Sequence, residues 1–212
     1  MLSAKELYFE KRAQILVKNL ESRSFEAFYC PTREAALEKA LSLIPAKATV
    51  GWGGAMSAEQ IGLMDAISAG DYTPIDRSLC TTAQEIRQTY LRCLSADVFI
   101  TGANALSLDG QMVNIDGTGN RLAAIAYGPE TILVIAGMNK VADSLDAAIT
   151  RARTVAAPMN QQRFLRKTPC SATSTCADCK SPECICNQIL ITRNCRPAGR
   201  IKFILVGEEL GL

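Results

Sequence analysis

Short apolar runs alternate with segments of helical periodicity along this chain, and this alternation restricts the fold more than any other feature. The runs at residues 98–101 and 131–136 carry no charged residue, which is typical of strands buried on both faces of a sheet. Further strands are predicted over residues 25–30, 48–50, 72–75, 188–192 and 201–206. Helical spacing is predicted over residues 3–21, 34–43, 57–67, 82–95, 120–126 and 141–156. This order predicts an α/β fold built on a layered sheet.

Length and charge limit the classes of protein to consider. The chain has 212 residues, for which one domain is the default. Its net charge is +2 and both signs are mixed, so it lacks the basic stripe that nucleic-acid binding needs. The charged N-terminal segment lacks a signal-peptide core, and no apolar run is long enough for a membrane span. We therefore expect a cytoplasmic protein that binds neither nucleic acid nor membranes. An edge strand or the N-terminal helix could support a homodimer.

Two glycine-rich turns join a strand to a helix, at residues 50–57 (VGWGGAMS) and 114–124 (NIDGTGNRLAA). Glycines let backbone N–H groups approach a ligand, and a helix N-terminus favours an anion. The simpler alternative is that both are tight strand-to-helix connections. The first turn is neither a Walker A loop nor a complete dinucleotide fingerprint, because Gly-Lys-Ser/Thr is missing and Met56 stands where the third glycine should be. The predicted ligand-binding residues of the two turns are Gly51, Gly53, Gly54 and Ser57 in the first, and Asn114, Asp116, Gly117, Gly119, Asn120 and Arg121 in the second.

Local signals predict how some of the elements begin and turn. Ser57 with Gln60, and Thr82 with Glu85, have the spacing of capping boxes at helix starts. Residues 108–111 (LDGQ) predict a hairpin, because Asp-Gly favours the tight type I′ turn. The two final strands are joined by a Pro/Gly turn.

Five of the nine cysteines lie within residues 170–186, in the spacing C-x5-C-x2-C-x4-C-x-C. The chain has no histidine, which excludes a Cys/His catalytic pair and a histidine-bound zinc. In a reducing compartment a cysteine cluster favours a metal over disulfides, and close thiolates select zinc or iron–sulfur. Cys176 and Cys179 could turn both sulfurs to one metal, and Cys170 and Cys186 would complete a set of four ligands. The sequence does not separate zinc from an iron–sulfur cluster, and a reduced loop without a metal is the alternative.

Several of these stretches together resemble the LUD (lactate utilisation) domain family, which includes LutC-like proteins. They are VGWGGAMSAEQIGLMDAI, TGANALSLDGQMVNIDGTGNRLAAIAYGPETILVIAGMNKV, AAPMNQQR, the cysteine segment and RIKFILVGEELGL. The family is similar in fold to ribose-5-phosphate isomerase, glucosamine-6-phosphate deaminase and the CoA transferases. The resemblance implies a three-layer α/β/α sandwich with a mainly parallel sheet, N-terminal helices and a cysteine-rich excursion before the last strands. It implies one domain over residues 1–212, with an N-terminal helical region at 1–46 and a cysteine-rich segment at 168–188. It also implies that Cys184 is an extra thiol.

The resemblance also raises the question of catalytic residues. Sugar-phosphate isomerases of this fold carry a catalytic carboxylate in a Gly-Ala-Asp motif, and the matching residues here are Gly102, Ala103 and Asn104. Asparagine cannot act as a general base, which argues against isomerase chemistry by that residue. The nearby ionisable residues are Asp109, Asp116 and Lys140, of which Asp109 is more simply explained as a turn residue beside Gly110. The catalytic candidates are Asn104, Asp116 and Lys140, and Gly102 and Asn104 join the predicted ligand-binding residues.

Three functions follow from these patterns. The first is an accessory protein of lactate or 2-hydroxy acid utilisation, which binds a small anionic metabolite at the glycine turns and works with iron–sulfur partner proteins. The second is an enzyme acting on a sugar phosphate or an acyl-CoA, by analogy of fold. The third is a non-catalytic module that senses an anion.

Overall fold

The computed structural model describes residues 2–164 and 166–212 and contains a wholly parallel main sheet. The spatial order of its six strands is β1-β10-β7-β4-β2-β3. They are β1 (Glu26–Cys30), β10 (Ile201–Val206), β7 (Thr131–Gly137), β4 (Val98–Gly102), β2 (Thr49–Gly53) and β3 (Thr73–Ile75). The predicted strands at 98–101 and 131–136 lie inside this sheet and are buried, because neither has a polar face.

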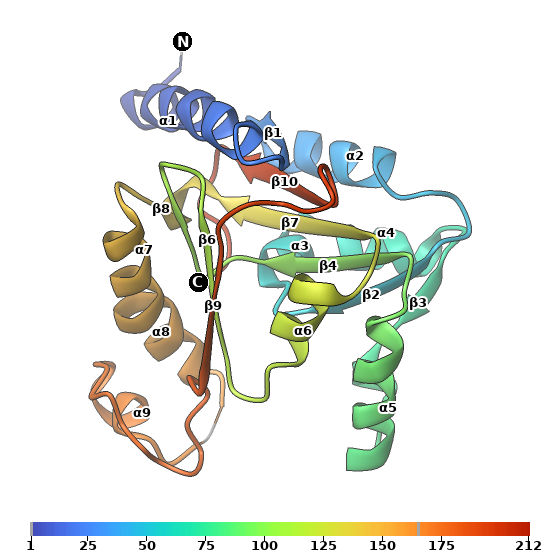
Figure 1. Ribbon diagram of the computed structural model, residues 1–212, viewed down its shortest axis with the longest axis vertical. Coiled ribbons are helices and arrows are strands. Elements are labelled where there is room, and N and C mark those ends of the chain that lie inside the picture. Colours follow the sequence, from blue (N-terminus) through green and yellow to red (C-terminus); the bar gives the residue numbers. More distant parts are fainter. Residues whose placement is uncertain (1, 165) are drawn as a thin grey trace.

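Helices cover both faces of the main sheet, as alternating strand residues show. Ile132 and Val134 belong to a buried cluster with α1 (Ala4–Glu21), α5 (Ala83–Cys93) and α6 (Asn120–Tyr127). Leu133 and Ile135 belong to a second cluster with α2 (Arg33–Ser42), α3 (Met56–Gln60) and α4 (Leu63–Ala69). Successive side chains of a strand point to opposite faces, so the two clusters lie on opposite sides of the sheet. The predicted three-layer α/β/α sandwich is thus confirmed (Figure 1).

One predicted helix is broken and one predicted cap is wrong. The segment predicted as a single helix over 57–67 forms α3 and α4, which are separated at Gly62 with φ 78°. Ser57 does not cap α3, because it lies inside the helix and the cap position is Ala55. The capping box of Thr82 and Glu85 at the start of α5 is confirmed.

A second, four-stranded sheet lies at the carboxyl ends of β4 and β7 (Figure 1). Its strands, in spatial order, are β8 (Val141–Ala142), β5 (Ala105–Ser107), β6 (Met112–Asp116) and β9 (Gln188–Thr192). β5 and β6 form the predicted hairpin. The predicted type I′ turn is wrong, because that turn needs a positive φ at both central residues, and only Gly110 (φ 91°), not Asp109, has one. The two final strands lie in different sheets, since β9 pairs with β6 and β10 with β7.

One helical stretch covers the second sheet and precedes the cysteine segment. It consists of α7 (Leu145–Arg151), a π-helical turn (Ala152–Ala156) and α8 (Ala157–Gln161). The helix predicted from residue 141 starts later because residues 141–142 form β8. The cysteine segment contains only the short α9 (Pro169–Thr173) and precedes β9 and β10, as predicted. Among the described residues, no helix combines the length and apolarity that crossing a membrane requires.

Candidate functional site

Polar and cationic side chains gather where β2, β4 and β7 end. β2 ends at Gly53 and is followed by Gly54, Ala103 and Asn104 follow β4, and a 3-10 turn (Met138–Lys140) follows β7. In open parallel sheets, ligands bind outside the carboxyl ends of the strands. These turns therefore form the candidate site.

Lys140 is the most unusual residue at this edge, because its amine is buried without an acid. The residue is 4% exposed, and Nζ donates to Ser57 Oγ at 3.1 Å and to the Ala103 carbonyl oxygen at 3.2 Å. None of the ion pairs within residues 2–164 and 166–212 includes Lys140. Burial, helped by the nearby charges of Arg151 and Arg121, lowers the pKa of Lys140 from 10.5 to about 7. Lys140 is therefore partly neutral near neutral pH.

Arg151 reaches the same place from the end of α7. Its Nη1 donates to the Asn104 carbonyl oxygen at 2.6 Å and to Leu212 O at 3.4 Å, and its Nε donates to the Asn139 carbonyl oxygen at 3.2 Å. These contacts hold the guanidinium across the turns that follow β4 and β7. Its Nη2 makes no hydrogen bond with any residue that the structure describes.

Arg121 binds both of the other predicted catalytic candidates. Its Nη2 donates to Asp116 Oδ1 at 2.6 Å, to Asn104 Oδ1 at 2.9 Å and to the Ile115 carbonyl oxygen at 2.7 Å. Asn104 Oδ1 also accepts from the Ile115 N–H at 2.9 Å. Asn104 and Asp116 therefore position Arg121, and Asp116 is not a free carboxylate. The Nη1 of Arg121 forms no hydrogen bond within the described part of the chain.

Two glycines leave room for these cations. Gly54 has φ 59°, and a Cβ there would lie 2.8 Å from Arg121 Nη1. A Cβ at Gly211 would lie only 2.5 Å from Lys140 Nζ, whereas one at Gly102 would instead meet the Gly54 carbonyl oxygen at 3.1 Å. The structure thus brings the first glycine turn together with Arg121 and Lys140, and it adds the segment that follows β10.

The remaining predicted ligand-binding residues have other neighbours. A Cβ at Gly51 would lie 2.7 Å from Cys93 Sγ in α5, so Gly51 allows that helix to pack on β2. A Cβ at Gly53 would meet the Phe99 ring at 3.2 Å. Asn114 Nδ2 donates to the Gly102 carbonyl oxygen at 3.0 Å, which ties β6 to the end of β4.

The second glycine turn packs against the end of the cysteine segment. A Cβ at Gly117 would lie 3.3 Å from Ile185 Cα, and one at Gly119 would lie 2.1 Å from Gln188 Oε1. Asn120 Oδ1 accepts a hydrogen bond from the Thr118 hydroxyl at 2.8 Å. Of the predicted ligand-binding residues of the second turn, Arg121 and its ion-pair partner Asp116 join the polar groups around Lys140. Arg151 and Asn139 were not predicted from the sequence, because no local motif marks them.

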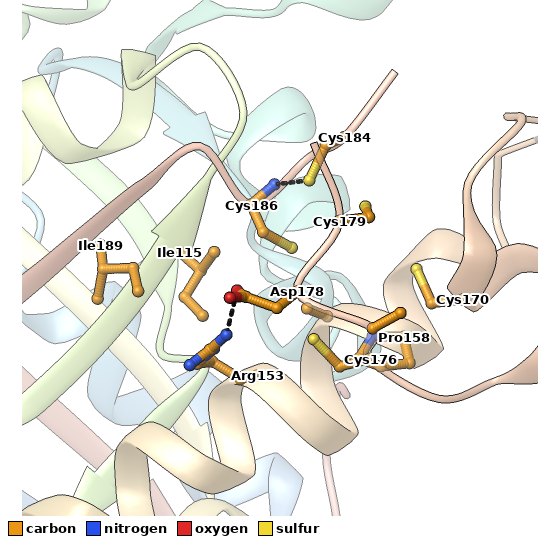
Figure 2. A pocket seen from close by; sticks show the side chains of 12 residues that line it. Ile115, Arg153, Pro158, Cys170, Cys176, Asp178, Cys179, Cys184, Cys186 and Ile189 are labelled. Carbon is orange, nitrogen blue, oxygen red and sulfur yellow. Dashed lines mark hydrogen bonds and ion pairs between the residues drawn. The ribbon is translucent and has the colours of Figure 1, made fainter. Parts of the chain in front are cut away.

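All five clustered cysteines line one cavity of about 250 Å³ (Figure 2). Asp178 reaches across this cavity to form an ion pair with Arg153 of the π-helical turn. Burial, with the nearby thiols of Cys184, Cys170 and Cys176, raises the pKa of Cys186 to about 12. Among the described residues, no three Cys, Asp or Glu side chains are arranged to hold a metal ion. The five cysteines therefore share a cavity without being arranged as metal ligands.

A buried amide lies on the helix beside this cavity. Gln161 is 0% exposed, and neither its Oε1 nor its Nε2 has a hydrogen-bond partner within the described chain. Residues three and four apart share a helix face, so Gln161 lies on the face of α8 that lines the cavity through Ala157 and Pro158. Buried polar groups without a partner are rare and need an explanation. Five thiols around one cavity are the type of donor that zinc and iron–sulfur clusters prefer, so the residues present fit such a group by their chemistry.

Comparisons with known proteins agree with this fold. A family model described as the LUD domain matches residues 13–206. The crystal structure of a DUF162 family protein from Deinococcus radiodurans covers 97% of this chain and 99% of its own, with a TM-score of 0.52 and 10% identity. That likeness shows a shared fold alone. Ribose 5 phosphate isomerase A from Neisseria gonorrhoeae covers 53% of this chain and 54% of its own, at 19% identity, and its TM-score of 0.34 carries no inference about activity. No curated protein matches the chain.

Proposed function

This chain belongs to the LUD domain family, and from that premise we propose that it serves lactate utilisation by binding a small 2-hydroxy carboxylate. The binding site in this proposal is the cationic centre, which we define as the side chains of Lys140, Arg151 and Arg121. The observation that carries the proposal is the buried Lys140 amine, which has no carboxylate partner among the described residues.

The charge balance of the cationic centre supports an anionic ligand. Among the described residues, Asp116 is the acidic side chain that pairs with the cationic centre, through Arg121. No Asp or Glu side chain of the described chain forms an ion pair with Lys140 or Arg151. Burying unpaired charge is costly, and a bound carboxylate would offset that cost. Arg121 Nη1 and Arg151 Nη2 are the donors left for its oxygens, and guanidinium donors suit carboxylates. The Ser57 hydroxyl, next to Lys140 Nζ, could bond to a 2-hydroxyl group.

The enzyme alternative has less support from the side chains. A sugar-phosphate isomerase needs a carboxylate free to move a proton. Asn104 stands at the matching position, and both Asn104 and Asp116 are engaged by Arg121. A phosphate group could still bind the same cations, so phosphates belong in the test as competitors.

For the cysteine segment, we propose that Cys170, Cys176, Cys179 and Cys186 hold zinc or an iron–sulfur cluster. The support is that all four thiols line one cavity. When bound, zinc would supply a structural staple for a segment without its own core, and a cluster would supply electron transfer. Iron–sulfur partner proteins belong to this proposal only in the second case.

The carboxylate site can be tested by thermal unfolding with lactate, inorganic phosphate or ribose 5-phosphate. A ligand at a hundred times its Kd stabilises by about 2.7 kcal/mol, which raises the Tm of a chain of this size by roughly 5 to 10 °C. We expect that increase with lactate for the wild type and none for Lys140→Met. Lys202→Met, which removes a lysine paired with Glu26 on the main sheet, is the matched control and should keep the increase.

The other outcomes are equally informative. An increase in Tm with the phosphates and none with lactate would favour the sugar-phosphate alternative over the carboxylate site. If none of the three ligands shifts the Tm, the proposed carboxylate site is wrong.

A further inference from the structure

We propose that Lys140 is a nucleophile that captures the carbonyl group of a 2-oxo acid as an imine, a step that rests on the carboxylate site proposed above. Lactate and its oxidised form differ only at C2, so a site that holds one holds the carboxylate of the other. The 2-oxo acid adds a carbonyl carbon, which is the electrophile that a lysine amine attacks.

The hydrogen bonds of the amine leave its lone pair free. A neutral lysine amine has two N–H donors, and Nζ here has two acceptors, Ser57 Oγ at 3.1 Å and the Ala103 carbonyl oxygen at 3.2 Å. No described carboxylate pairs with the amine to hold it as an ammonium. Burial and the two guanidiniums also lower the pKa of Lys140 to about 7, which keeps a substantial neutral fraction at neutral pH.

The two arginines would orient the substrate from the far end. Lys140 Nζ donates to the Ala103 carbonyl oxygen, and Arg151 Nη1 and Arg121 Nη2 donate to the carbonyl and side-chain oxygens of Asn104, so all three cations meet the turn that follows β4. Each arginine keeps one Nη group without a hydrogen bond in the described chain. A carboxylate held by these groups would place C2, its neighbouring atom, beside Nζ. Positioning of this kind converts a bimolecular attack into an effectively unimolecular one.

The backbone that follows β10 covers the amine in this structure. A Cβ at Gly211 would lie 2.5 Å from Lys140 Nζ and 2.6 Å from Ser57 Oγ. Two hydrogen bonds hold this cover, from Gly211 N–H to Gln60 Oε1 at 2.6 Å and from Arg151 Nη1 to Leu212 O at 3.4 Å. Displacing Gly211 and Leu212 breaks only these two bonds and leaves the buried Leu210 as an anchor. It also frees Arg151 for a ligand oxygen.

The chemical step balances without a redox partner. The Nζ lone pair forms a bond to C2, and the C2–O π electrons move to oxygen, which takes a proton. Nζ gives up both of its protons, the first to the C2 oxygen as the carbinolamine forms and the second to the hydroxyl, which leaves as water and gives the neutral imine. One water leaves for each imine formed. The Ser57 hydroxyl, within hydrogen-bond distance of Nζ, is placed to pass these protons.

The test is reductive trapping of the intact, full-length protein. Protein with pyruvate is treated with sodium borohydride, and the modified lysine is identified by peptide mass spectrometry. We expect the reduced pyruvate adduct to concentrate on Lys140 of the wild type and to be lost in Lys140→Met. Lys202→Met should keep it. An excess of lactate should suppress the adduct in the wild type, an arm that needs no variant to fold.

Each outcome separates this inference from the proposed function. If lactate stabilises the wild type but pyruvate leaves no adduct on Lys140, the carboxylate site stands and the imine is refuted. An adduct spread over surface lysines and insensitive to lactate refutes the imine as well. If neither lactate binding nor an adduct is found, both proposals fail.

Discussion

Replacing Lys140 with methionine is expected to remove a steep rise of stability with pH. In the unfolded chain the ammonium keeps its ordinary pKa of 10.5, whereas burial beside Arg151 and Arg121 lowers the pKa of the folded chain to about 7. Between these values the unfolded state binds one more proton, so the free energy of unfolding rises with pH by up to about 1.4 kcal/mol per pH unit. Below pH 7 both states are protonated, and the contribution of Lys140 no longer changes.

The measurement is urea unfolding of both proteins from pH 6 to 9.5. Lys140→Met should be more stable than the wild type at pH 6 by several kcal/mol, since no unpaired charge is then buried. The stability advantage of Lys140→Met should shrink as pH rises. Once the amine is neutral in the folded state, the remaining difference in unfolding free energy is about 1 kcal/mol and favours the wild type, because the variant lacks the hydrogen bonds of the amine. Lys202→Met should follow the wild-type profile. Parallel profiles for the wild type and Lys140→Met would show that the amine is not buried as an unpaired cation.

Removing two central thiols is expected to abolish metal binding and to release the cysteine segment. Structural zinc contributes about 10–16 kcal/mol of apparent free energy in zinc-finger peptides, and this segment has only one short helix of its own. A Cys176→Ser, Cys179→Ser double variant should therefore bind neither zinc nor iron with acid-labile sulfide. Limited proteolysis should cut it between residues 166 and 187 much faster than the loaded wild type.

The extra thiol provides the control for that experiment. Cys184→Ser removes a cysteine that lines the same cavity and lies outside the proposed ligand set. It should keep both the metal and the resistance to proteolysis. Metal analysis of protein purified without oxygen identifies the metal. No metal in the wild type, with equal cleavage of the double variant, would contradict the proposed ligand set.

Much of the fold could be predicted from local patterns. β7 has no charged residue over 131–136, and such a run can only be a buried strand or a buried helix. The length of this run and its flanking residues favour a strand, and the strand is confirmed. By contrast, the break at Gly62 was missed, because the apolar spacing of α3 and α4 reads as one continuous helix.

The candidate site was less predictable, because it depends on contacts far apart in the sequence. Ser57 has local capping spacing, yet its hydroxyl accepts from Lys140, which lies 83 positions away. Arg151 is one of several helical arginines, and only the packing of α7 on the second sheet brings it to Asn104. Asp116 was a catalytic candidate from the sequence, and its pairing with Arg121 follows from the turn between β6 and α6.

The most direct test of the carboxylate site is calorimetric titration of lactate at pH 8, in two buffers with different heats of ionisation. Lactate has no carbonyl at C2, so it binds without imine chemistry. Its carboxylate should raise the pKa of Lys140, and the wild type should take up close to one proton for each lactate bound. Lys140→Met should show neither saturable binding nor proton uptake. Saturable binding without proton uptake, or equal binding by the variant, would contradict a site centred on Lys140.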